Sequence, residues 1–379
     1  MTATAPPRAR YGAAALLAVL AGAALHALGV APLTGAGVVA GLFLAAAALR
    51  GTGLSFALSV FAGVAAALFH PHLFITWGGY PLSNLIVPLI QIIMFGMGTT
   101  LSVGDFLRVL RWPRAIAIGA ALQFTVMPVT GLLLARTFGF DGAVAAGIVL
   151  VGAAPGGVAS NVITFLAGAN VALSVTMTAC STLLSPLLTP LAMTQLAGQY
   201  VPISFTAMMW SIVHMIVLPI VAGLVVHHLF YRRMRWLSRI LPLVSMAAIC
   251  FIITAITALS RDRLLEVAAA LVAVVVLHNA IGYLLGYGGG RIFGLGRVDA
   301  RTVSVEVGLQ NAGMASGLAI GVLHSPEAGL AAAIFGPWMN ITGSLLASWW
   351  RRRPVAPEGV ASALPSGGLH EASRPTSAR

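Results

Sequence analysis

The stretch TVSVEVGLQNAGM, residues 302–314, places one carboxylate and two amides, Glu306, Gln310 and Asn311, in an otherwise apolar run. Glu306 and Gln310 are one helical turn apart, so their oxygens face the same way and suit a hard cation. A carboxylate near the centre of a bilayer is costly unless it is paired or faces a wet cavity, and no arginine lies within this span. We therefore expect a cation or proton site at Glu306. The alternative is an acid that stays neutral or bonds only to neighbouring helices.

A second interruption, APGGVASN, covers residues 154–161. Pro155 lacks a backbone donor, and Gly156 and Gly157 accept dihedral angles that other residues avoid, so an α-helix should unwind there. The oxygens of Ser160 and Asn161 could then cap the next helix segment or coordinate a cation. The free N–H groups at the start of that segment suit an anion. A simple proline kink is the alternative.

Further polar side chains lie in other apolar runs. Ser174 and Thr178 are spaced i, i+4 and could face Asn161 and Glu306, although such hydroxyls often bond their own helix. The amide of Gln123 needs several partners in lipid.

His278 and Asn279 could pass protons or line a cavity, but a hydrogen bond between helices is the more ordinary role for such a histidine. Asn340 could reach the same cavity or hold helices together.

Composition indicates an integral membrane protein, because 59% of the 379 residues are hydrophobic, 8% are charged and the mean hydropathy is +0.97. Apolar stretches recur along almost the whole chain and leave no room for a second, soluble domain. The net charge of +12 comes from arginines in short loops, which indicates topology signals rather than a nucleic-acid surface. Cys180 and Cys250 lie within apolar stretches, so no disulfide or metal cluster is expected.

Enzymatic classes are disfavoured. The chain has no lysine, which excludes a P-loop lysine or a Schiff base and favours an ion gradient as the energy source. It contains no HExxH or GxSxG motif and no aspartate within a confident apolar span.

The apolar stretches predict ten transmembrane helices in residues 54–350, an all-α fold. Their approximate ranges are 54–70, 83–100, 115–135, 143–167, 171–195, 203–229, 239–259, 265–289, 302–322 and 328–350. Ten divides into two halves of five, and an odd-numbered repeat inserts its second copy upside down. The two interruptions fall in the fourth span of each half, which is typical of the binding site of an inverted-repeat transporter.

The segments flanking this unit are expected to differ from it. Residues 1–53 contain GAAALLAVLAGAALHALGV and GAGVVAGLFLAAAAL, which predict an extra membrane hairpin; a cleaved signal peptide is the alternative. Residues 351–379 have too little apolar content to fold and are expected to form a disordered tail.

Arginine counting predicts the orientation, because short cytoplasmic loops are enriched in basic residues. One side carries thirteen arginines: Arg108, Arg111, Arg114, Arg232, Arg233, Arg235, Arg239, Arg291, Arg297, Arg301, Arg351, Arg352 and Arg353. The other side carries Arg136, Arg261 and Arg263. The arginine-rich side, with both ends of the ten-helix unit, is expected to face the cytoplasm from the plasma (inner) membrane.

Several motifs together resemble the bile acid:sodium symporter family, most closely its bacterial bile-acid-transporter-like and pantoate-transporter-like members. They are GAAPGGVASNVITFLAGANVALSVTMTACSTLLSPLLTP, TVSVEVGLQNAGMASGLA, MFGMGTTLSVGDF, ALQFTVMP, LHNAIGYLLGY and WMNITGSLLA. The resemblance covers residues 54–350 and is specific, since the motifs recur in order at fitting separations.

This resemblance implies a panel domain of spans 1, 2, 6 and 7, a core domain of spans 3–5 and 8–10, and two sodium sites where the discontinuous spans 4 and 9 cross. The first sodium site would use Ser160, Asn161, Ser174, Thr178 and Glu306. The second would use Gln123, Glu306, Gln310 and the carbonyls of Val307 and Leu309. The substrate would bind near Pro155, Gly156, Gly157, Val158, Asn311 and Asn340.

The resemblance implies a sodium symporter that imports an organic anion by alternating access. Similar proteins carry bile acids, pantoate and related pantothenate precursors, pyruvate or other organic anions, and a small carboxylate is expected here. Family members often have a polar residue at the position of Val158 and a histidine at that of Met339, so this cavity should be more apolar. A proton-coupled carrier or channel that uses Glu306 and His278, and a sensor without transport, are alternatives. The oligomeric state stays open.

Overall fold

The computed structural model describes residues 31–49, 53–102, 104–105, 111–230, 236–353 and 355. Within these residues the protein is helical apart from one short antiparallel hairpin, β1 (Thr76–Trp77) and β2 (Tyr80–Pro81), between the first two spans. The all-α prediction is confirmed.

Each of the ten predicted spans corresponds to one helix or to a consecutive pair. The single helices are α3 (Gly53–Phe69), α4 (Ile86–Gly98), α6 (Pro113–Thr137), α9 (Val171–Ala192), α12 (Leu237–Leu259), α13 (Arg261–Ile292) and α16 (Pro326–Arg351). The pairs are α7 (Gly142–Ala153) with α8 (Ala159–Leu166), α10 (Phe205–Ile212) with α11 (Leu218–Phe230), and α14 (Arg297–Gly308) with α15 (Ala312–Gly321). Two short 3-10 helices, η1 (Pro71–Phe74) and η2 (Leu82–Leu85), and two π-helical segments, η4 (Met193–Ala197) and η5 (Val213–Val217), extend or join them.

Six described helical segments are long and apolar enough to cross a bilayer by themselves. The fourth and ninth spans are not among them, because each is divided into two short helices, α7 with α8 and α14 with α15. Both first halves are 12 residues long, as the inverted repeat predicts.

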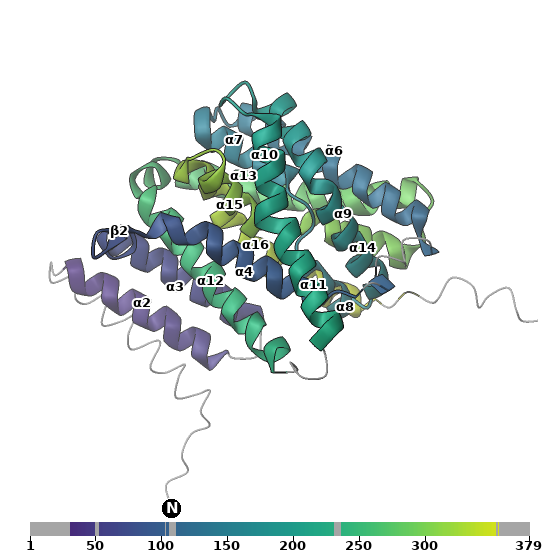
Figure 1. Ribbon diagram of the computed structural model, residues 1–379, viewed down its shortest axis with the longest axis horizontal. Coiled ribbons are helices and arrows are strands. Elements are labelled where there is room, and N and C mark those ends of the chain that lie inside the picture. The colour runs from purple at the N-terminus through teal and green to yellow at the C-terminus, as the bar shows by residue number, and fades with distance from the viewer. Residues whose placement is uncertain are drawn as a thin grey trace, which may run out of the picture.

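The helices form two packed groups. Helices α3, α4, α11 and α12 pack against one another, and α6, α7, α9, α13, α14 and α16 form the second group. These correspond to the expected panel and core domains. Helix α16 also contacts α3 and α12 and so lies where the two groups meet. Figure 1 shows α3, α4 and α12 on one side of the molecule.

The two broken spans cross at their interruptions. Helix α7 ends because Ala154, directly before Pro155, is extended with ψ 152°. Leu309, after the end of α14, is also extended, with φ −103° and ψ 99°. Gly156 and Gln310 form an antiparallel bridge there.

The backbone groups that each break exposes are bonded by the other break. Gly157 N donates to Leu309 O at 2.8 Å, and Asn311 N donates to Pro155 O at 2.9 Å. Since lipid offers no hydrogen-bond partner, this exchange lets two helices be interrupted in the middle of the bundle.

The second arm of the expected N-terminal hairpin is a helix, α2 (Ala31–Ala48), which lies beside α3 (Figure 1). Ser55 Oγ, on α3, donates to Ala46 O at 2.8 Å. The first arm, residues 12–30, lies outside the described residues. So does nearly all of the tail after residue 353.

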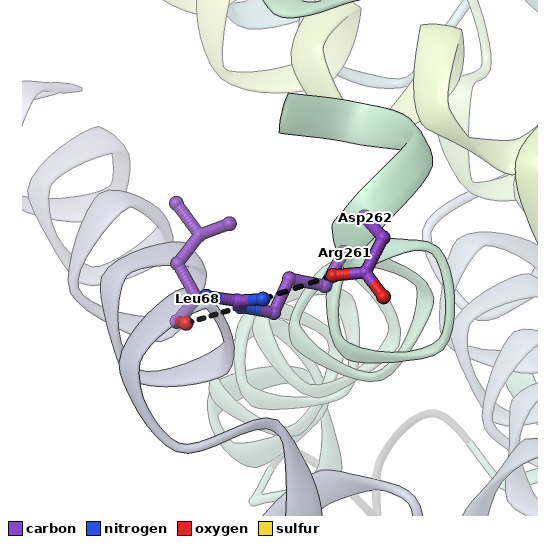
Figure 2. A network of polar contacts seen from close by, with 3 residues as sticks. All are labelled: Leu68, Arg261 and Asp262. Atoms are coloured by element: carbon purple, nitrogen blue, oxygen red, sulfur yellow. Dashed lines mark hydrogen bonds and ion pairs between the residues drawn. The ribbon is translucent and has the colours of Figure 1, made fainter. Parts of the chain in front are cut away.

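Arg114 and Arg261 make hydrogen bonds at opposite ends of α13. At the arginine-rich end, Arg114 Nη2 donates to Phe293 O at 2.7 Å. At the opposite end, Arg261 Nε donates to Leu68 O at 2.7 Å, and its Nη1 lies 2.9 Å from Asp262 Oδ1 (Figure 2). Arg261 therefore joins the end of α3 in the panel to the start of α13 in the core.

Candidate cation site at the crossed helices

Glu306 lies in the last turn of α14 and is 1% exposed. Thr178 Oγ1 donates to its Oε1 at 2.6 Å, and Ser174 Oγ lies 3.3 Å from its Oε2 in position to donate. The two hydroxyls come from successive turns of α9, which runs alongside α14. Among the described residues, hydroxyl groups are the carboxylate's partners and no basic side chain pairs with it.

Helix α8 brings two more oxygen-bearing side chains to the same place. Ser174 Oγ lies 2.9 Å from Asn161 Oδ1, and Ser160 Oγ lies 3.3 Å from Thr178 Oγ1. The structure thus brings together all five side chains expected for the first sodium site. The cluster is rich in acceptor oxygens, because the one proton of Ser174 Oγ is shared between Asn161 Oδ1 and Glu306 Oε2. A hard cation satisfies several such oxygens at once.

The residues expected for the second site lie at the same crossing but are bonded to each other. Gln123 Nε2 donates to Gln310 Oε1 at 2.6 Å and to Ala154 O at 2.7 Å. Gln310 Nε2 donates to Val307 O at 2.6 Å, and Leu309 O accepts from Gly157 N. A second ion here would have to displace amide N–H groups from these oxygens.

Three residues of the first break form the crossing itself. Pro155 and Gly157 exchange backbone bonds with the second break, and Gly156 lies directly against the Glu306 carboxylate. A Cβ on Gly156 would collide with that carboxylate. Val158 differs from them because it is 37% exposed at the start of α8.

The two asparagines expected near the substrate have different surroundings. Asn311 Oδ1 caps α15 by accepting from Met314 N at 2.9 Å, whereas its buried Nδ2 has no hydrogen-bond partner. Asn340 is partly exposed on α16, and its Nδ2 donates to Gly336 O of its own helix at 2.7 Å. Asn311 therefore keeps an unused donor at the crossing, and Asn340 bonds within its own helix.

The sequence left open whether Ser160 and Asn161 cap α8 or coordinate a cation. Ser160 and Asn161 do not cap α8: the helix begins at Ala159, and its N-cap residue Val158 makes no side-chain cap bond. Helical geometry resumes directly after the two glycines, so both polar side chains fall in the first turn of α8 and reach α9 instead.

Arg301 is also placed differently from the loop position that arginine counting gave it. It lies within α14 and is only 8% exposed. Its guanidinium donates to Arg353 O at 2.8 Å and Trp350 O at 3.4 Å, and lies over the Trp350 ring. This arginine therefore caps the end of α16 and does not neutralise Glu306.

His278 does not contact Glu306. Its Nε2 lies 2.9 Å from Met127 O, and its ring packs edge-on against Phe335 with 5.6 Å between centroids. The bond between helices, the more ordinary role for such a histidine, is the one that the structure contains.

Asn279 has a structural role that the sequence analysis did not predict. Its Nδ2 donates to Gly308 O at 2.9 Å, and its Oδ1 accepts from Thr342 Oγ1 at 2.7 Å. Gly308 O is a carbonyl at the broken end of α14, as Ala154 O is at the broken end of α7, where Gln123 bonds it. Gln123 and Asn279 lie on corresponding third spans of the two repeats, and this correspondence was the available signal.

Comparison with known proteins decides the family. The model of the Sodium Bile acid symporter family matches residues 87–267. The uncharacterized sodium-dependent transporter YocS of Bacillus subtilis (strain 168) is 40% identical over 284 residues, 75% of this chain and 86% of that protein. This chain belongs to the sodium bile acid symporter family. The family resemblance that the sequence motifs indicated is thereby confirmed.

Two plant proteins are also similar to this chain. The probable sodium/metabolite cotransporter BASS1 of rice chloroplasts is 33% identical over 306 residues, 81% of this chain and 74% of that protein. The Arabidopsis thaliana protein of the same name is 32% identical over 269 residues, 71% and 67% respectively. The protein is thus a membrane transporter of a sodium-dependent family.

Proposed function

We propose that the protein is a symporter that uses an inward sodium gradient to import a small organic anion. The observation that carries this proposal is the isolated Glu306 carboxylate. It is buried among the hydroxyls of Ser174 and Thr178 with no basic partner among the described residues. An unpaired carboxylate at this depth is unfavourable, and a bound cation removes that cost.

Two sodium ions are proposed. The first binds among Ser160, Asn161, Ser174, Thr178 and Glu306, where the oxygens are already gathered. The second binds between Glu306 and the amides of Gln123 and Gln310, after these amides turn away from the carbonyls that they hold. The second ion therefore requires amide groups to turn, whereas the first requires only that the hydroxyl protons of Ser174 and Thr178 turn away from Glu306.

The proposed substrate is a small carboxylate with an apolar part, such as a bile acid or a pantoate-like acid. Asn311 Nδ2 is a buried donor without a partner, and the N-terminal ends of α8 and α15, which are the positive ends of their helix dipoles, lie at the crossing. Both features favour an anion beside the crossing. The exposed Val158 and the methionine at position 339 favour an apolar neighbour for the rest of the molecule.

The proposed mechanism is alternating access. Sodium neutralises Glu306 and orders the crossed breaks, and the anion then binds beside the starts of α8 and α15. The core then moves against the panel and opens the site to the cytoplasm, which we place at the arginine-rich end of a bacterial-type inner (plasma) membrane. Release of sodium into the cytoplasm leaves the Glu306 carboxylate without its cation. The empty core then moves back to the position that is open to the outside.

Uptake by purified protein in proteoliposomes tests this function. Candidate anions are first selected by thermal shift with sodium or choline, because a ligand of the folded state raises its stability. Uptake should follow an inward sodium gradient and be lost in Glu306→Gln. Glu327→Gln, the same change at an exposed position at the start of α16, should behave like the unchanged protein. Uptake that is indifferent to sodium, or intact in Glu306→Gln, would overturn the proposal.

The proton-coupled alternative lacks structural support, because the His278 ring is bonded to the Met127 carbonyl and not to Glu306. Replacing sodium with choline at fixed pH separates the two functions. A sodium symporter stops, whereas a proton-coupled carrier continues.

A further inference from the structure

A second polar cluster lies one helical turn from the Glu306 site, where α9 and α14 begin. It consists of Asn170, Asp299 and Thr302, hereafter the N-terminal clamp. Asn170 Nδ2 donates to Asp299 Oδ1 at 2.9 Å, and Asn170 N donates to Thr302 Oγ1 at 2.9 Å. None of these three residues belongs to either expected sodium site.

Every polar atom of Asn170 is used. Besides these two donors, its Oδ1 caps α9 by accepting from Leu173 N at 3.1 Å. Its carbonyl accepts from Ser174 N at 3.0 Å and lies 3.3 Å from Thr302 Oγ1. Asn170 thus starts α9 and holds it to α14 with the same side chain and peptide group.

The clamp and the cation site repeat at the same spacing on both helices. Asn170 precedes Ser174 by four residues, and Thr302 precedes Glu306 by four residues. The pairs Asn170 with Thr302 and Ser174 with Glu306 are therefore two successive contacts, about 6 Å apart along the helices. A slip of one residue would turn a side chain by about 100° and separate Ser174 from Glu306.

The clamp also positions α8. The turn between α8 and α9 is short and closes through Ala169 N, which donates to Thr164 O at 3.0 Å, with Gly168 in the left-handed region at φ 64°. Because Asn170 ends this turn, fixing it against α14 also fixes the helix that carries Ser160 and Asn161. All three helices that supply oxygens to the cation site are joined by one cluster.

We propose that the N-terminal clamp sets the sodium affinity of the Glu306 site by fixing the register of α9 and the α8–α9 turn against α14. Asn170, Asp299 and Thr302 are positioning residues and do not touch the ion. The inference depends on the proposed function, in which Glu306 holds sodium. Outer-layer partners of metal ligands commonly change metal affinity by about 10–100-fold when removed.

The test measures the half-saturating sodium concentration, by thermal shift of purified protein and by uptake in proteoliposomes. Thr302→Val and Asn170→Ala should raise it by about 10–100-fold, while maximal uptake at saturating sodium is kept. Thr302→Ser, which retains the hydroxyl, should restore the original value. Thr176→Val is the matched control, because Thr176 is buried on α9 but bonds only its own helix at Ala172 O.

Asp299 provides a second test. Its side chain is partly exposed, so its substitution should not prevent folding. Asp299→Asn keeps an acceptor oxygen for Asn170 and should leave the sodium dependence unchanged, whereas Asp299→Leu removes the acceptor and should weaken it. This pair decides the question if the variants of Thr302 or Asn170 do not fold.

The outcomes separate this inference from the proposed function. An unchanged half-saturating sodium concentration in folded Thr302→Val and in Asp299→Leu would overturn the clamp, while a lost sodium response in Glu306→Gln would leave the proposed function standing. A sodium response retained in Glu306→Gln would overturn the proposed function itself. A loss of maximal uptake at unchanged sodium affinity would mean that the clamp supports folding or movement, and would also overturn the inference.

Discussion

The two breaks that cross in the middle of the protein have the same geometry but different chemistry. The first, after α7, is made by the backbone properties of Pro155, Gly156 and Gly157 and carries no charge. The second, Leu309 to Asn311, contains no proline or glycine, follows the charged Glu306, and is held by the side chains of Gln310 and Asn311. The two repeats therefore share one backbone geometry. The glycines of the first break leave room for a neighbouring side chain, and the segment before the second break carries the charged group.

The third spans show the same division. Gln123 and Asn279 each donate to a carbonyl at the end of a broken helix, but Gln123 also bonds Gln310 across the crossing, whereas Asn279 bonds Thr342 away from it. We therefore expect changes at the first break to act by occupying space, and changes around the second to act by removing ligands or support.

Among changes that leave Glu306 itself in place, the largest effect on sodium binding is expected from Gly156→Ala. The new Cβ would displace the Glu306 carboxylate from Thr178 and Ser174. Glu306 is the charged ligand of the proposed site, and breaking a buried charge pair costs about 3–5 kcal/mol, so moving this carboxylate should weaken sodium binding about a hundredfold or more. A thermal-shift titration with sodium measures this.

Gly313→Ala is the matched control for this change. Within the described part of the chain and outside its own helix backbone, its Cβ would come within 4 Å of Asn311 Oδ1 alone, at 3.5 Å. If Gly156→Ala and Gly313→Ala have equal half-saturating sodium concentrations, the first break does not act by leaving room for the Glu306 carboxylate.

The next effect concerns the hydroxyl closest to the carboxylate. Thr178→Val removes the hydroxyl that lies 2.6 Å from Glu306 Oε1 and should raise the half-saturating sodium concentration about tenfold, since the proposed ion loses one oxygen ligand. Thr178→Ser keeps the hydroxyl and should stay close to the original value. Equal sodium titrations of the two variants would show that the hydroxyl is not a ligand.

Asn279 and Gln123 sharpen the comparison between the third spans. Asn279→Leu leaves Gly308 O without its side-chain donor and should destabilise the protein by about 1–3 kcal/mol, with a small change in sodium affinity. Gln123→Leu should cost similar stability and also weaken sodium binding. Denaturant unfolding in detergent and sodium titration of both variants measure the two quantities. A larger loss of sodium affinity in Asn279→Leu would reverse the assigned roles.

The smallest effect is expected far from the crossing, at Arg261. Arg261→Gln removes the bond to Leu68 O that joins panel to core (Figure 2). Arg261 is partly exposed, so the change should alter the uptake rate only a few-fold and leave the half-saturating sodium concentration unchanged. Initial uptake rates at saturating sodium test this. A large change in sodium affinity would mean that the two domains share the ion site.

Local chemistry in the sequence was sufficient to predict much of this arrangement. Pro155 with its two glycines located the first break, and Glu306, Gln310 and Asn311 located the second, because proline, glycine and buried polar groups act on their own segment. Helical spacing also predicted that Ser174 and Thr178 face the same way. The resemblance to a known family joined these segments into one site.

Contacts between distant segments could not be read in the same way. The exchange of backbone bonds between Pro155 and Asn311 depends on two segments meeting in space, as does the contact between Asn170 and Thr302. Nor did the sequence reveal that Gln123 and Gln310 satisfy one another, because either amide could have faced an ion. The sequence also could not decide whether Ser160 and Asn161 cap α8 or reach α9, because this depends on the residue at which the helix resumes.

The most direct test of the central claim is equilibrium binding of radioactive sodium to the purified protein. The unchanged protein and Glu327→Gln should bind sodium saturably. Glu306→Gln should lose that binding, because its amide cannot supply the negative charge that makes a buried cation favourable. Saturable sodium binding of equal affinity in Glu306→Gln would contradict the account.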